Sequence, residues 1–82
     1  MPKTTLRKTL RSKGHRALID LLATTRSNAG LTQRDLAARL KRPHSFIRRI
    51  EAGERRVDVV EFIEIARVLE VDPQQLFAKL VE

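Results

Sequence analysis

Cysteine, tryptophan and tyrosine are missing from this chain of 82 residues, and phenylalanine occurs three times. Without cysteine the chain can form no disulfide and no thiolate metal site, and two histidines, His15 and His44, are too few to hold zinc by themselves. We therefore expect no metal and no other cofactor, and a reducing compartment. The shortage of aromatic side chains also disfavours modules that stack the bases of single-stranded nucleic acids.

Long apolar stretches are missing as well. No run approaches about 18 consecutive apolar residues, and the basic N-terminus is not followed by an apolar segment with a small-residue cleavage site. These patterns predict neither a membrane span nor a secretory signal, so we expect a soluble cytoplasmic protein. The hydrophobic content of 41% is enough for one small core, and we predict a single domain.

The charge is large and unevenly distributed. The formal net charge of +7 favours a polyanionic partner such as nucleic acid. Residues 1–16 contain six Lys or Arg and no acid, whereas residues 57–82 contain two Lys or Arg against six acids. The positive field is therefore confined to the first two thirds of the chain.

The first 14 residues differ from the rest in composition, because they have no acid and few large apolar side chains. We predict a flexible basic arm over residues 1–14 and a folded domain over residues 15–82. Leu6 and Leu10, four residues apart, leave open a short helix that packs back on the domain.

Helical periodicity and start signals recur five times after the arm, and no stretch alternates like a strand. Three starts pair a capping residue with a side chain that can reach back: Thr32 with Asp35, Asp58 with Glu61, and Asp72 with Gln75. We predict an all-α, compact five-helix bundle. Its helices are expected over residues 15–29, 33–40 and 43–52, and after Asp58 and Asp72.

Apolar residues at helical spacing indicate the core. We expect all three phenylalanines to be buried rather than exposed as stacking platforms. In the two C-terminal helices the predicted core residues are Val59, Phe62, Ile63, Ala66, Leu69, Leu76, Phe77 and Leu80.

The helices over residues 33–40 and 43–52 are joined by a short turn, Lys41-Arg42-Pro43, whose proline also opens the second helix. One helix of such a unit can brace on a DNA backbone while the other enters the major groove. At about 100° per residue, Ile47 and Ile50 share one side of the second helix. Ser45, Arg48, Arg49 and Ala52 project from the opposite side, which is therefore free to read DNA.

The segments GLTQRDLAARL, SFIRRIEAGERR and VDVVEFIEIARVLEVDPQQL resemble the Cro and XRE type of phage-repressor helix-turn-helix domain, the lambda-repressor-like family, over residues 17–80. The matching positions are Gln33, Ala37, Ile47, Ile50, Glu51 and Gly53. The resemblance implies a five-helix domain that binds operator DNA, usually as a homodimer on a two-fold site, to repress or activate transcription. Some members of the family also lay an N-terminal arm along the DNA, so a DNA contact by residues 1–14 stays open.

The resemblance also implies roles for individual residues of this chain. Arg49 is our first choice for a bidentate contact to guanine, and Arg26 with Glu51 is expected to form a structural salt bridge. Thr32, besides its capping role, and its neighbour Gln33 are expected at a phosphate. The residues implied in base reading are His44, Ser45, Arg48 and Arg49, and those implied in phosphate binding are Thr32, Gln33, Lys41, Arg42, Arg55 and Arg56.

Two positions depart from the family pattern, because Lys41 and Glu70 stand where glycine is common. We expect both residues to adopt a positive φ, at a cost on the order of 1 kcal/mol each. A changed turn at Lys41 could shift the following helix in the groove.

Other functions remain open beside a transcriptional regulator. The acidic C-terminal helices could dock a partner protein, as in an antitoxin or a coactivator-like bridging factor. A membrane-surface protein held by the arm ranks last, because two leucines give little membrane affinity. We do not predict an enzyme: adjacent residues such as His44 and Ser45 point about 100° apart on a helix, and no third group is evident to orient them. His15 is expected only to pack or to face solvent.

Overall fold

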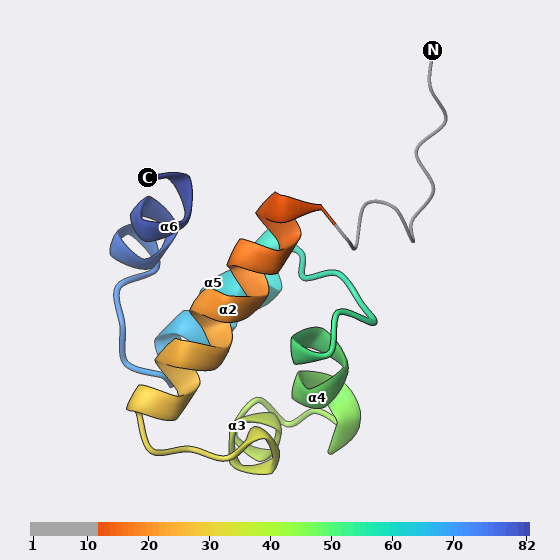
Figure 1. The fold of residues 1–82 in the computed structure, drawn as a ribbon. Coiled ribbons are helices and arrows are strands. Elements are labelled where there is room, and N and C mark those ends of the chain that lie inside the picture. Colours follow the sequence, from red (N-terminus) through yellow and green to blue (C-terminus); the bar gives the residue numbers. More distant parts are fainter. Residues whose placement is uncertain (1–11) are drawn as a thin grey trace.

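The computed structural model describes residues 12–82, and this part of the chain contains five α-helices and no β-strand. The predicted all-α class is therefore confirmed. Residues 1–11, most of the predicted arm, lie outside the described residues. Figure 1 shows the helices packed around the long α2. Their bounds are α2 Lys13–Asn28, α3 Gln33–Arg39, α4 Ser45–Glu51, α5 Val59–Val68 and α6 Pro73–Val81.

Two of the predicted capping boxes are formed in full. The Thr32 hydroxyl accepts the Asp35 N–H at 3.0 Å, and the Asp35 carboxylate accepts the Thr32 N–H at 2.9 Å. Asp58 and Glu61 exchange the equivalent bonds at 2.7 and 3.1 Å. These bonds satisfy backbone donors that a helix start leaves free, and so they fix where α3 and α5 begin.

Of the remaining helix starts, the one at Asp72 lies where it was predicted but lacks the full capping box, and the other two differ from the prediction. Ser12 accepts the His15 N–H and starts α2 at Lys13, two residues before the expected position. Asp72 caps α6 through the Gln74 N–H, and within residues 12–82 no bond returns from Gln75. Helix α4 begins at Ser45 rather than Pro43, since its side-chain cap is replaced by a turn in which the Phe46 N–H bonds the Pro43 carbonyl.

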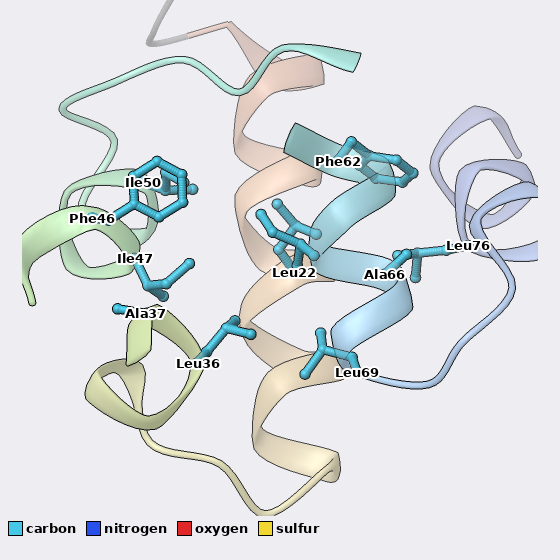
Figure 2. Packing of buried hydrophobic residues seen from close by; sticks show 11 residues of the cluster. Leu22, Leu36, Ala37, Phe46, Ile47, Ile50, Phe62, Ala66, Leu69 and Leu76 are labelled. Carbon is cyan, nitrogen blue, oxygen red and sulfur yellow. The ribbon is translucent and has the colours of Figure 1, made fainter. Parts of the chain in front are cut away.

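The core lies between α2, α3, α4 and α5, and α6 adds one leucine to it (Figure 2). Phe62, Ala66 and Leu69 line α5 toward this core, as predicted. The buried residues are Leu22, Leu36, Ala37, Phe46, Ile47, Ile50, Phe62, Ile65, Ala66, Leu69 and Leu76.

Two core predictions are wrong. Val59 is 74% exposed and Phe77 is 52% exposed. Val59 is the first residue of α5, and no described element covers it. The Phe77 ring packs edge-to-face on Phe62, with ring centroids 6.2 Å apart. Ile63 and Leu80, also predicted as core residues, are half-buried.

Lys41 and Glu70, which stand where glycine is common, adopt the expected positive φ, 58° and 59° respectively. A left-handed residue after a helix lets the next N–H reach back to close the last turn. Accordingly, the N–H of Arg42 bonds the carbonyl of Ala37 at 2.9 Å, and the N–H of Val71 bonds that of Ala66 at 3.0 Å. A lysine and a glutamate therefore adopt the left-handed turn geometry expected at these two positions.

Candidate nucleic-acid interface

Helices α3 and α4 form a close pair joined by the turn at Lys41. Ala37 of α3 is completely buried, and Figure 2 shows it facing Ile47 of α4. A methyl group at the crossing lets the two helix backbones approach closely. The pair therefore has the geometry of a helix-turn-helix.

Helix α4 has one buried and one exposed side, as the periodicity predicts. Ile47 and Ile50 are buried, and Phe46 is 8% exposed. The opposite side gathers the residues predicted to read bases, and all of them are exposed: His44, Ser45, Arg48 and Arg49.

These exposed side chains differ in the contacts that they already make with other side chains of the protein. The His44 ring Nδ1 lies 3.0 Å from Nη2 of Arg34, an exposed α3 residue that is not among the predicted DNA-contacting residues. Arg48 lies 3.8 Å from Glu54, a loose pair at the surface. The Arg49 side chain has no hydrogen bond or ion pair with any residue of 12–82. Of the two arginines predicted to read bases, Arg49 has less to release before it binds a ligand.

The C-terminal end of α4 is tied to α2 and α3 through Glu51. Its carboxylate accepts two bonds from Arg26, at 2.7 and 3.0 Å, which is the ion pair that the resemblance implies. Arg26 also donates to the Leu31 carbonyl at 2.7 Å. The hydrogen bond to Glu51 raises the pKa of Arg26, although burial acts in the opposite direction.

Gln33 belongs to the same cluster. Its side-chain Nε2 donates to Glu51 at 2.8 Å, so this amide contacts α4 in the free protein. Thr32, the other predicted phosphate ligand at this end of α3, uses its hydroxyl to cap the helix. Both residues are placed primarily as structural contacts of the helix pair.

A second ionic cluster, which the sequence did not reveal, lies at the other end of α4. Arg55 donates two bonds to the carboxylate of Glu61, at 3.0 and 3.2 Å. Arg42 lies 3.8 Å from the same carboxylate and 3.8 Å from that of Glu64. The guanidinium carbons of Arg42 and Arg55 each lie 4.8 Å from the centre of the Phe46 ring.

Glu61 is 7% exposed and ionised more readily than an ordinary glutamate. Burial by itself would raise its pKa, but bonds from Arg55 and from the Asp58 N–H, with the charges of Arg55 and Arg42, hold it below the usual value. The pairs join a turn and a loop to α5, so no helical spacing in the sequence predicts them. The remaining predicted phosphate ligands, Lys41 and Arg56, are exposed.

Other kinds of site find no support in the described residues. No helix within 12–82 is long and apolar enough to cross a membrane. The same range contains no group of three potential metal ligands. His15, for which no function is expected, is half-buried with an unpartnered Nε2, and burial together with the nearby Arg56 charge lowers its pKa.

Comparison with known proteins agrees with this geometry. Residues 17–80 match the family model described as a helix-turn-helix domain. A solved structure, an XRE-family like protein from Pseudomonas syringae pv. tomato str. DC3000, is 49% identical in sequence, with 89% of each chain covered and a TM-score of 0.80. No curated protein matches the chain significantly. The chain therefore belongs to the Cro/XRE type of helix-turn-helix family, a class of DNA-binding regulators.

Proposed function

We propose that this protein binds double-stranded DNA in a sequence-specific manner by placing α4 in the major groove, and that it acts as a small transcriptional repressor or autoregulator. One observation carries the proposal: an exposed cationic side of α4 is backed by the buried Phe46, Ile47 and Ile50. A B-form major groove, about 12 Å wide, admits a helix presented in this way.

Base reading is assigned to His44, Ser45, Arg48 and Arg49, which lie on this exposed side. Arg49 is the first choice for guanine, because its guanidinium fork matches the O6 and N7 acceptors and has no competing partner within residues 12–82. Arg48 needs to release only a 3.8 Å surface pair.

Phosphate binding is assigned to residues around this helix, which would set its register without reading sequence. Lys41 and Arg56 are the strongest of them, since both are exposed. The resemblance also implies Thr32, Gln33, Arg42 and Arg55, but the side chains of these four already have partners inside the protein.

A homodimer in the cytoplasm completes the proposal, since two half-sites about 34 Å apart double the sequence that one helix can read. The exposed apolar side chains Val59, Val60, Phe77 and Val81, all on α5 and α6, support an interface there. They also support the second candidate, a protein-interaction module of the antitoxin or bridging kind. No catalytic step is part of either proposal.

Selection of bound duplexes from a random library tests the proposed function, with affinity measured as a function of salt. We expect a preferred sequence and an affinity that falls steeply with salt. Arg49→Ala should lose about 1 to 3 kcal/mol of discrimination at one base position. Arg67→Ala, which removes the same charge from the exposed side of α5, is the control and should keep the preference. A wild-type chain without salt-sensitive affinity for any duplex would rule the proposal out.

A reporter placed under the selected sequence then separates the two candidates. A repressor lowers expression when the sequence overlaps the promoter, and Arg49→Ala restores it. A chain that acts only as a protein-interaction module selects no duplex in the first experiment and represses no reporter.

A further inference from the structure

Glu61 is the one charged residue of the described chain that is less than a tenth exposed. It lies on α5, outside the side of α4 proposed to read bases. Its carboxylate nevertheless accepts both bonds of the Arg55 fork, at 3.0 and 3.2 Å, and the Asp58 N–H at 3.1 Å. A buried carboxylate with this many donors is fixed in position.

Through Arg55, this carboxylate reaches the start of α4. The Arg55 guanidinium lies 4.8 Å from the centre of the Phe46 ring, and Phe46 is the second residue of α4. Arg42, from the turn before α4, lies at the same distance from the ring and within 3.8 Å of Glu61. Four elements therefore meet at this point: the turn, α4, the following loop and α5.

The two ends of α4 are held separately. The C-terminal end is fixed by Glu51 through Arg26 and Gln33. At the N-terminal end, His44 makes no side-chain cap. At this end, the cation–π contacts of Phe46 with Arg42 and Arg55, which are themselves paired with Glu61, correspond to the Glu51 cluster.

We propose that Glu61 is a positioning residue for base reading, which fixes the N-terminal end of α4 against α5 through Arg55 and Phe46. This inference rests on the proposed function. Glu61 itself does not touch DNA. Arg55 is then a structural arginine rather than a phosphate ligand, because moving its fork to a phosphate would leave a buried carboxylate largely unpaired.

The test compares Glu61→Gln with Glu64→Gln on two duplexes, the sequence selected by the wild type and a scrambled one. Both substitutions remove one negative charge from α5, and Glu64 is exposed with only the long contact to Arg42. Removing an acid alone should strengthen binding to both duplexes equally. We therefore expect Glu64→Gln to keep the ratio of the two affinities, and Glu61→Gln to lower it about tenfold, the size of one lost base contact.

Arg55→Lys provides a second test of the same contact, which can still be made if Glu61→Gln fails to fold. Lysine keeps the positive charge but loses the two-pronged bond and the flat group beside Phe46. If Arg55 has a positioning role, Arg55→Lys should also lower the ratio of the affinities for the selected and the scrambled duplex. If Arg55 binds a phosphate, lysine can take its place and the ratio should stay unchanged. The double variant should lose no more than either single variant, because both remove the same contact.

The results separate the possible failures. An affinity ratio for Glu61→Gln equal to that of Glu64→Gln overturns the inference while leaving the proposed function intact. Tighter binding of Glu61→Gln than of Glu64→Gln to both duplexes also overturns it, because Arg55 would then be a phosphate ligand that Glu61 restrains. A wild type that does not distinguish the two duplexes removes the proposed function and the inference together.

Discussion

At the scale of single residues, two glutamates divide the arginines of this basic chain into two kinds. Glu51 and Glu61 each accept two bonds from one arginine, Arg26 and Arg55 respectively. Those arginines fix the ends of α4. Arg49 and Arg56 are left exposed and positively charged. Pairing inside the protein, rather than the number of cations, therefore decides which arginines are available to a ligand.

Arg26→Met should lower the free energy of unfolding by about 3 kcal/mol, because it leaves the mostly buried Glu51 without its main partner. Urea unfolding measures the change. Arg48→Met is the matched control, since its partner Glu54 is exposed and 3.8 Å away. That control should change stability by less than about 1 kcal/mol. Equal effects of the two substitutions would contradict the structural role of Arg26.

Glu61 should make stability depend on pH in the acid range. Its folded pKa lies below the ordinary value of 4.5, because the bonds and charges of Arg55 and Arg42 outweigh burial. Between the two values the unfolded chain binds more protons, so the stability that Glu61 adds is present above about pH 4.5 and lost as the pH falls through the folded pKa. Urea midpoints of the wild type and Glu61→Gln should therefore converge on acidification. If the difference between the two urea midpoints stays constant down to pH 2, the Glu61 carboxylate is not the cause of the pH dependence.

At the scale of elements, the parts of the fold that depend on near neighbours in sequence could be predicted. The capping boxes at Thr32 and Asp58 involve residues three apart, and the two sides of α4 follow from helical periodicity. Contacts between elements could not be predicted in this way. The burial of Phe77 depends on what covers α6, and the site of Glu61 depends on a loop and a turn that meet only in the folded chain.

The helix end at Glu70 offers an element-scale prediction. Glu70 is exposed with φ at 59°, a conformation that costs an L-residue about 1 kcal/mol and glycine almost nothing. Glu70→Gly should therefore raise the free energy of unfolding by up to about 1 kcal/mol, less the extra chain entropy of glycine. Glu64→Gly, inside α5, should instead lower it by about 1 kcal/mol. Thermal unfolding of both variants decides; a loss at Glu70 equal to that at Glu64 would refute the argument.

At the scale of the whole molecule, the acidic and basic ends have different tasks in the proposed function. The cationic side of α4 is assigned to DNA, and the exposed apolar residues of α5 and α6 are assigned to a second copy of the chain. The sequence predicts this division of charge, but it does not show which apolar residues of α5 and α6 stay uncovered.

Dimerisation can be checked by sedimentation of the full chain at micromolar concentration. We expect a dimer, and Val59→Asp should shift it to a monomer, since Val59 is 74% exposed and would place a charge in the apolar interface. Thr24→Asp, on an exposed position of α2, adds the same charge elsewhere and should leave the dimer intact. A wild type that sediments as a monomer, alone and on DNA, would remove the dimer from the proposal.

The complete burial of Ala37 has a consequence for how the α3–α4 pair can change. A single methyl group sets the spacing between α3 and α4, so any bulkier side chain at this position must lift α4 outward or tilt it. In the proposed function, such a change would alter how deeply each side chain assigned to base reading enters the groove, without touching any of them. New sequence preferences in relatives with the same α4 residues are therefore to be sought first at this crossing.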